Sequence, residues 1–293
     1  MACMADVDLN KVVRQHLEMD GFFTGFALRS QTAARDRSAP AAGGPGVVAP
    51  SVPAREAAKT QLAAEVQAVI PQPPSGLPRS ACSDMIRNPR SSAEAAAELA
   101  AVAAEAGQCR KCQLGSSRRN CVPGEGHSRA RIMFVGEAPG ADEDAQGRPF
   151  VGRAGQLLDK IIAACGLRRE EVFIGNILKC RPPENRDPRP DEIINCLPYL
   201  QRQVEAISPE IIVALGGHAA KTLLNTVRPI GQLRGQFHEY CPGLGLRPVK
   251  LMATFHPAYL LRNYSEQNRR YVWEDMKRVL TELGLPIPER DKN

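Results

Sequence analysis

Short apolar runs alternate with helical patterns over the second part of the chain. Four runs rich in β-branched residues predict buried strands, at residues 131–135, 172–178, 211–215 and 249–254. Between or after them, apolar positions at helical spacing predict helices, at residues 154–165, 190–207, 217–225 and 267–283. Strands that alternate with helices favour a mostly parallel sheet covered on both faces. The pattern therefore predicts a three-layer α/β/α domain over residues 86–285, followed by a C-terminal tail at 286–293.

A further helix is predicted at the start of this domain. Ser91 and Glu94 have the spacing of a capping box, and an alanine-rich segment runs from there to Ala106. Gly107 follows and suits a C-terminal cap.

The residues before this domain have a different composition. Residues 31–80 contain no Phe, Tyr or Trp, and Ala, Pro and Gly fill 24 of these 50 positions. Such a segment cannot bury enough apolar surface to offset its chain entropy. Residues 1–85 are therefore predicted to be a largely disordered extension. Residues 9–19 have roughly helical spacing and predict either a short helix that docks on the domain or a protein partner, or a frayed isolated helix.

Composition narrows the functional class. The 293 residues include no run of about 18 apolar positions, so no membrane-spanning segment is expected. The first 20 residues mix charges of both signs, unlike a secretory signal, which favours a cytoplasmic protein. The net charge of +6 permits a polyanionic partner without requiring one. In a reducing compartment, nine cysteines are candidates for metal binding rather than for disulfides.

Polar and glycine-rich segments follow the predicted strands. In open parallel sheets, ligands bind beyond the carboxyl ends of the strands. Four segments lie there, at residues 136–144, 176–186, 216–218 and 255–259. The functional site is therefore predicted at this rim of the sheet.

The glycine loop after the first strand fits neither a Walker motif nor a dinucleotide fingerprint. Its four carboxylates would repel a phosphate, whereas its glycines permit close approach to a neutral planar ligand. Phe150 follows in a polar loop. The residues alone leave open whether this ring is a core plug or a stacking platform.

The cysteine spacing predicts a metal site. Cys109 and Cys112 form a close pair, and Cys180 and Cys196 lie beyond two predicted strands. Four thiolates can hold a zinc ion or an iron–sulfur cluster. Cys121 is a competing fourth ligand, and the residues alone slightly favour zinc.

Three segments carry a resemblance to a known family. GEAPGADEDAQGRPFVGRAGQLLDKII (136–162), GNILKCRPPENRDPRPDEI (175–193) and FHPAYLLRN (255–263) resemble the family 4 uracil-DNA glycosylases, the iron–sulfur branch of that superfamily. The resemblance covers about residues 105–285 and implies a central parallel sheet flanked by helices. It also implies removal of uracil from single- or double-stranded DNA in base excision repair. The cofactor implied is a [4Fe-4S] cluster on Cys109, Cys112, Cys180 and Cys196, with zinc as the alternative.

The resemblance also assigns the uracil site, to Gly136, Glu137, Ala138, Glu143, Phe150, Asn176 and His256. Asn176 is expected to read the pyrimidine edge, because an amide can donate to O4 and accept from N3–H, whereas cytosine reverses both polarities. Phe150 would stack on the ring, and Glu143 would fill the space beside C5. His256 would donate toward O2 as negative charge develops there.

Two roles are less well defined by the sequence. Better-known uracil glycosylases have an Asp that orients the attacking water, and Ala138 stands at that position. Glu137 is the nearest carboxylate and is the expected catalytic partner of His256. In the loop after His256, Leu260 is favoured over Leu261 as a wedge that enters the DNA stack, although either residue could be core.

DNA binding is expected to depend mainly on contacts with the phosphate backbone. The protein is expected to be a monomer. Candidate phosphate contacts are Arg118, Arg119, Lys179, Arg181, Arg186 and Arg262. The competing hypothesis is a non-enzymatic nucleic-acid-binding module with a structural four-cysteine metal site.

Overall fold

The computed structural model describes residues 91–242 and 247–289. The predicted N-terminal extension, its helix at residues 9–19, and the end of the C-terminal tail lie outside the described residues.

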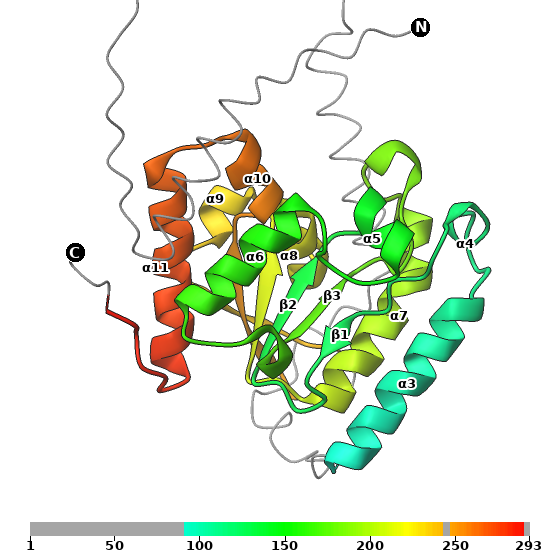
Figure 1. Cartoon of the computed structure of the whole chain (residues 1–293), viewed down its shortest axis with the longest axis horizontal. Coiled ribbons are helices and arrows are strands. Elements are labelled where there is room, and N and C mark those ends of the chain that lie inside the picture. The colour runs from blue at the N-terminus through cyan, green and yellow to red at the C-terminus, as the bar shows by residue number, and fades with distance from the viewer. Residues whose placement is uncertain (1–90, 243–246, 290–293) are drawn as a thin grey trace, which may run out of the picture.

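A six-stranded sheet forms the centre of the domain (Figure 1). Its strands are β1 (Glu125–Gly126), β2 (Ile132–Gly136), β3 (Phe173–Asn176), β4 (Ile211–Leu215), β5 (Phe237–Tyr240) and β6 (Val249–Thr254). The spatial order is β1-β3-β2-β4-β6-β5. The four middle strands are parallel, and the two edge strands pair antiparallel to them. All four predicted strands are therefore confirmed, and the two short edge strands are additions.

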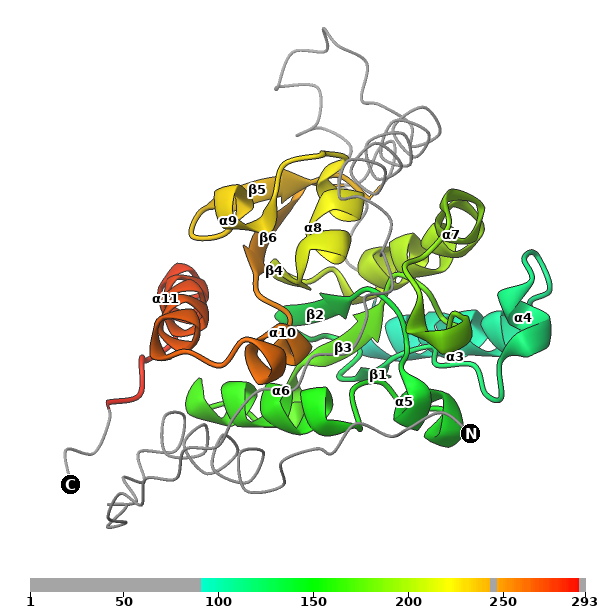
Figure 2. The same ribbon diagram turned by 90° about the horizontal axis from the view of Figure 1, so that it is seen from above.

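Helices cover both faces of the sheet, as Figure 2 shows from above. One layer holds α3 (Ser92–Gln108), α7 (Pro190–Ile207) and α8 (Gly217–Leu224). The other holds α6 (Arg153–Ala164) and α11 (Glu266–Glu282). Short helices join them: α4 (Leu114–Ser117), α5 (Ala141–Gln146), α9 (Ile230–Leu233), α10 (Pro257–Arg262) and the 3-10 turns η2 (Arg169–Glu171) and η3 (Pro183–Asn185). The predicted three-layer α/β/α fold is confirmed.

The alternation of side chains along β2 divides the core between these layers. Met133 and Val135 are buried among side chains of the α3, α7 and α8 layer, whereas Ile132 and Phe134 are buried among those of the α6 and α11 layer. A strand that is apolar on both faces is typical of a covered parallel sheet. The core thus fixes the sheet rigidly beneath the rim at its carboxyl end.

The first described helix begins as predicted but ends differently. Ser91 accepts from the Glu94 backbone N–H, and the Glu94 carboxylate accepts from the Ser91 N–H, which completes the capping box. The predicted cap at Gly107 is wrong, because the helix continues to Gln108 and Cys109 is the C-cap. The Arg118 guanidinium donates to the carbonyls of Ala106 and Gly107, so these terminal acceptors are satisfied without a left-handed glycine.

Within the described residues, no helix combines the length and the apolar character needed to cross a bilayer.

Candidate active site

The carboxyl ends of the parallel strands open into one cleft of about 540 Å³. This size is within the usual range for sites that bind small ligands. Six of the seven predicted uracil-site residues line the cleft: Glu137, Ala138, Glu143, Phe150, Asn176 and His256. The seventh, Gly136, is buried beneath it at the end of β2. The structure therefore gathers these sequence-distant segments at the predicted rim.

Asn176 ends β3 with its side chain buried. The Lys179 ammonium donates to its backbone carbonyl over 2.8 Å, which fixes this strand end. A Cβ atom on the neighbouring Gly136 would lie only 2.4 Å from Asn176 Oδ1, so glycine is required for this close approach. Asn176 Oδ1 has no hydrogen-bond partner within the part of the chain that the structure describes. A buried acceptor without a partner costs about 1–3 kcal/mol, so this oxygen favours a ligand that supplies an N–H.

His256 follows β6 and is the N-cap of α10. The Ala258 backbone N–H donates to His256 Nδ1 over 3.0 Å, so in the neutral ring the proton is on Nε2. Burial and, to a smaller extent, the nearby Arg262 charge lower the pKa of His256 to about 4, against an opposing effect of the Glu143 carboxylate. The imidazole is therefore neutral at physiological pH, and its Nε2–H remains available as a donor in the cleft.

This lowered pKa gives a direct prediction for a pH titration. The ring-proton NMR signals of His256, assigned by their absence in His256→Asn, should not move between about pH 8 and pH 5, because the pKa lies near 4 rather than near 6.5. A His256 midpoint near 6.5 would contradict the neutral-donor assignment.

Phe150 is held in an unusual backbone conformation, with φ of 51°. Its ring is almost fully buried, joins the core cluster of the α6 layer, and also lines the cleft. It stacks on the His256 ring with a centroid separation of 5.6 Å and an interplanar angle of 30°. The core-plug interpretation of this ring is therefore confirmed, and the same ring also lines the cleft, whereas its stacking on a ligand stays a prediction.

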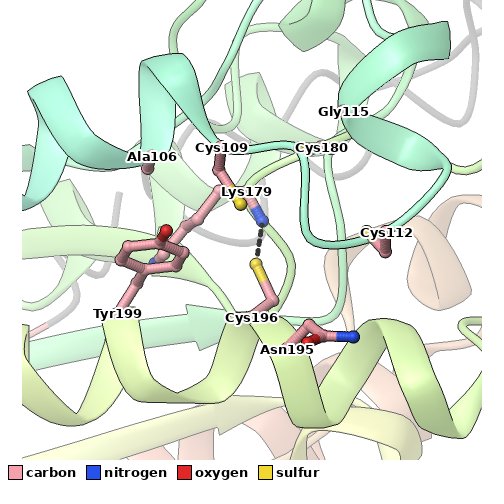
Figure 3. A pocket seen from close by; sticks show the side chains of 9 residues that line it. All are labelled: Ala106, Cys109, Cys112, Gly115, Lys179, Cys180, Asn195, Cys196 and Tyr199. Atoms are coloured by element: carbon pink, nitrogen blue, oxygen red, sulfur yellow. Dashed lines mark hydrogen bonds between the residues drawn. The ribbon is translucent and has the colours of Figure 1, made fainter.

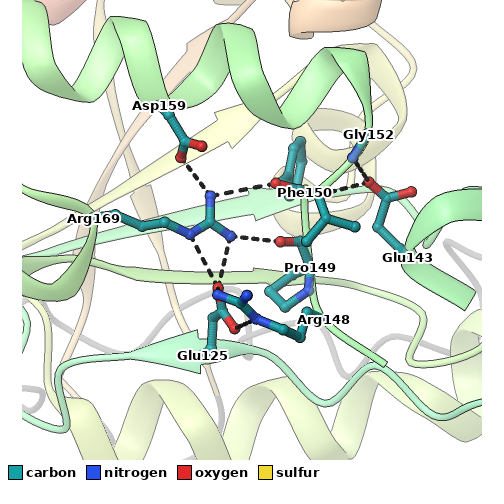
Figure 4. A network of polar contacts seen from close by, with 9 residues as sticks. Glu125, Glu143, Arg148, Pro149, Phe150, Gly152, Asp159 and Arg169 are labelled. Atoms are coloured by element: carbon teal, nitrogen blue, oxygen red, sulfur yellow. Dashed lines mark hydrogen bonds and ion pairs between the residues drawn. The ribbon is translucent and has the colours of Figure 1, made fainter. Parts of the chain in front are cut away.

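Two side chains hold the Phe150 loop from opposite sides (Figure 4). Arg169 donates to the carbonyls of Pro149 and Phe150 and is itself paired with Glu125 and Asp159. From the other side, Glu143 Oε1 accepts the backbone N–H groups of Val151 (2.9 Å) and Gly152 (3.0 Å). A non-glycine residue with positive φ persists only where its surroundings over-determine it, and these contacts do so.

Glu143 also closes the glycine loop. Its Oε2 accepts the Gly140 N–H over 3.1 Å, as the capping carboxylate of α5. With three backbone donors, the carboxylate is fixed in position at the wall of the cleft. Glu143 therefore also has a structural role that the sequence did not indicate, because its carboxylate joins the glycine loop to the Phe150 loop.

Glu137 lies at the mouth of the cleft together with Asp187 and His218. Their ligand atoms all lie within 4.8 Å of one another. Burial raises the pKa of Glu137, and the Asp187 charge acts in the same direction, whereas His218 opposes both. The sequence places His218 at the rim but does not single out Asp187, which lies one residue beyond the rim segment 176–186 and within the motif at 175–193.

A second pocket contains the four predicted metal ligands (Figure 3). Cys109 caps α3, Cys112 lies in the following turn, Cys180 follows β3, and Cys196 lies on α7. Cys121 does not line this pocket, which favours the predicted set over the competing ligand. The structure thus brings together four thiols from three separate segments, which is suitable donor chemistry for a metal group.

Hydrogen bonds to sulfur support this interpretation. The Lys179 backbone N–H donates to Cys196 Sγ over 3.2 Å, and the Arg118 guanidinium donates to Cys180 Sγ over 3.1 Å. Such donors stabilise thiolate ligands. Burial raises the pKa of the Cys196 thiol to about 12, so metal binding would have to release this proton.

The structure corrects the predicted DNA wedge. Leu260 is 1% exposed and belongs to the core cluster of the α6 layer, so its side chain is not available to enter a duplex. The sequence predicts a loop after His256. Pro257 instead occupies the first turn of α10, where its missing N–H costs nothing, and the helix turns Leu260 inward.

Leu260→Ala should therefore act on stability. Removing a fully buried leucine side chain costs about 2–5 kcal/mol through lost burial and the cavity left behind. The neighbouring Leu261 is only partly buried, and Leu261→Ala is the matched control with a smaller expected loss. Thermal unfolding of both variants provides the measurement, and equal midpoints would contradict the core assignment.

One of the predicted phosphate contacts is also wrong. Lys179 is 1% exposed, and its ammonium donates to Gln203 Oε1 over 2.6 Å, so it faces the interior. Arg186 is ion-paired with the buried Glu192 carboxylate but is partly exposed and lines the cleft, so it stays a prediction. Arg119 and Arg262 are exposed and stay candidates, and Arg262 lines the cleft.

Comparison with known proteins agrees with this geometry. Residues 123–278 match the model of the uracil DNA glycosylase superfamily, and the chain belongs to that superfamily. It is similar to the type-4 uracil-DNA glycosylase of Saccharolobus solfataricus, with 46% identity over 188 residues, covering 62% of this chain and 85% of the relative. The type-4 enzyme of Archaeoglobus fulgidus is 47% identical over 184 residues, covering 61% and 90%. The resemblance to the family 4 branch is confirmed.

Proposed function

We propose that the protein is a DNA repair hydrolase that cleaves the N-glycosidic bond of a flipped-out deoxyuridine, releases uracil and leaves an abasic site. Membership of the uracil DNA glycosylase superfamily supports this activity. The observation that carries it is a single strand-end cleft with a buried, unpartnered amide oxygen on Asn176 and a neutral imidazole donor on His256.

Base selection follows from the chemistry of Asn176. A uracil inside a duplex must first leave the stack, at a cost of a few kcal/mol. In the cleft, its N3–H supplies the donor that Asn176 Oδ1 lacks, and its O4 accepts from the amide N–H₂. Cytosine presents an acceptor and a donor in the reverse order. Cytosine would therefore leave buried polar groups unpaired at both positions.

Phe150 and Glu143 shape the rest of the cavity. Phe150 offers the aromatic wall on which the flipped base stacks. Glu143 occupies the space beside C5, and its three backbone hydrogen bonds prevent it from swinging away to admit the methyl group of thymine. Gly136, Glu137 and Ala138 contribute main-chain groups around the ring.

His256 stabilises the transition state. As the glycosidic bond lengthens, the sugar gains oxocarbenium character and negative charge grows on uracil O2. A neutral imidazole whose Nε2–H is not used by the Ala258 contact can strengthen its hydrogen bond to this oxygen without giving up a proton. Glu137 is the carboxylate best placed to receive a proton from the attacking water.

The cysteine pocket is proposed to hold a [4Fe-4S] cluster on Cys109, Cys112, Cys180 and Cys196, with zinc as the alternative. When bound, the cluster supplies a structural cross-link between the end of α3, the segment after β3 and α7. Lys179 relates this pocket to the uracil site, because its backbone N–H contacts Cys196 and its ammonium contacts the Asn176 carbonyl. Iron and sulfide analysis with a broad absorbance near about 400 nm supports the cluster, whereas zinc without iron contradicts it.

The substrate partner is uracil-containing DNA, single- or double-stranded, engaged mainly through the phosphate backbone near Arg262. The proposed function needs no second copy of the chain, since all of the groups invoked above come from one molecule, and we propose a monomer. A cytoplasmic, nucleoid-associated location suits this substrate.

The activity is tested with oligonucleotides that carry uracil, hypoxanthine, thymine or cytosine at one position. Alkali cleavage at the abasic site should appear for uracil, under catalytic turnover, and not for thymine or cytosine. No cleavage with excess enzyme would refute the proposed activity and favour a non-enzymatic nucleic-acid-binding module.

A further inference from the structure

Three ionisable side chains from separate segments meet at the mouth of the cleft. Glu137 directly follows β2, Asp187 lies in the loop after η3, and His218 is in the first turn of α8. His218 Nε2 lies 3.7 Å from Asp187 Oδ1, and one ligand atom from each of the three residues lies within 4.8 Å of the other two. All three line the same cleft as Asn176 and His256.

These separations are informative about what the three residues bind. At 3.7 Å, His218 and Asp187 are too far apart for a direct hydrogen bond. Two hydrogen bonds of about 2.8 Å from one water hold their partners about 4.6 Å apart at a tetrahedral angle. A zinc ion with bonds of about 2.1 Å would draw its ligands to about 3.4 Å. The 3.7 Å separation lies between these two values, so the test below includes an arm that separates a bridging water from a bound cation.

The burial of these three residues and the nature of the neighbouring side chain favour this cluster as the site of the attacking water. Glu137 is partly buried, whereas Asp187 and His218 are exposed at the mouth, so a water can enter from solvent and be held from the inner side. Ala138, the next residue, has only a methyl group and cannot orient a water. The raised pKa of Glu137 makes its carboxylate a better proton acceptor than an exposed one.

We propose that Glu137, Asp187 and His218 together hold and deprotonate the water that attacks C1′ of the sugar. This inference rests on the proposed glycosylase function and assigns its missing nucleophile site. The C1′–N1 bond breaks with its electron pair leaving on uracil. The water oxygen bonds to C1′, and its proton passes to the Glu137 carboxylate, while Asp187 and His218 orient the remaining hydrogen and lone pair. The uracil anion is then protonated by solvent.

The test uses single-turnover release of uracil from an oligonucleotide in the full-length protein. Asp187→Asn and His218→Ala should each lower the rate constant by about tenfold or more, and Glu137→Gln by about 10²-fold or more. The double variant Glu137→Gln/His218→Ala should be no slower than about the Glu137→Gln protein, since both changes remove the same water. The affinity for uracil-containing DNA should stay within about twofold. His127→Ala, an exposed histidine outside the cleft, is the matched control and should retain the wild-type rate.

A second readout follows the nucleophile itself. In aqueous methanol, the wild-type protein should form mainly the abasic sugar, because its bound water is already in place. His218→Ala and Asp187→Asn should form a larger share of the 1-O-methyl sugar, since bulk solvent then competes for C1′. A merely structural role would slow the reaction without changing this ratio.

The inference is overturned if the wild-type protein releases uracil and the Asp187→Asn and His218→Ala variants do so at the wild-type rate with an unchanged product ratio. The proposed function would remain intact. Activity that requires an added divalent cation would overturn it as well, because the three residues would then be metal ligands. Absence of uracil release by the wild-type protein would instead refute the proposed function.

Discussion

His256→Ala lowers the single-turnover rate constant of uracil release by about 10²–10³-fold, the usual loss when one donor to a developing anion is removed. The expected loss is large because the imidazole is neutral and partly buried, and its Nδ1 is already occupied by the Ala258 N–H. Nε2–H is therefore the atom that can meet uracil O2. Binding of uracil-containing DNA should change far less than the rate, since this hydrogen bond strengthens mainly in the transition state.

The matched variant is His256→Gln, whose amide N–H₂ can reach close to the position of Nε2. It should recover part of the rate that the alanine variant loses. Gel quantification of abasic sites with enzyme in excess measures all three proteins. A His256→Ala protein that is folded and as fast as the wild type would remove the residue from the mechanism.

Asn176→Asp reduces the preference for uracil over cytosine by about 10²-fold or more. The substitution removes the amide N–H₂ that serves O4, and a protonated carboxyl group in the same place can donate to cytosine N3 and accept from its N4–H₂. Each lost or mismatched buried contact is worth about 1–3 kcal/mol, so two contacts account for this change. Rates on uracil and cytosine oligonucleotides, measured in parallel, give the ratio.

Asn263→Asp provides the control for the added charge, because this asparagine is exposed at the end of α10. Its uracil-to-cytosine ratio should equal that of the wild type. If Asn176→Asp also leaves the ratio unchanged, the amide does not read the pyrimidine edge.

The parallel core of the fold could be predicted from the sequence because its strands carry uninterrupted apolar runs. Residues 211–215, for example, are buried throughout β4. The edge strands gave no such signal. β1 has two residues, and β5 mixes His238 and Glu239 with two aromatic rings. Edge strands need burial on only part of their surface, so their composition does not separate them from loops.

Side-chain environments were harder to predict than side-chain positions. The sequence placed Lys179 near the rim, but its burial lowers the pKa to about 8 and its contacts with Asn176 and Gln203 arise only from tertiary packing. The neutral state of His256 likewise depends on the Ala258 N–H and on burial against Phe150. The sequence pattern predicts which side chains lie near one another. Their ionisation states depend on burial and on contact distances, which are known only from the folded structure.

The most direct measurement is a crystal structure of the protein bound to DNA with a flipped deoxyuridine, captured with a slow variant such as Glu137→Gln. We expect the Asn176 amide within hydrogen-bond distance of uracil O4 and N3, His256 Nε2 within hydrogen-bond distance of uracil O2, and the uracil ring stacked against Phe150. A uracil bound elsewhere, or either side chain directed away from it, would contradict the account.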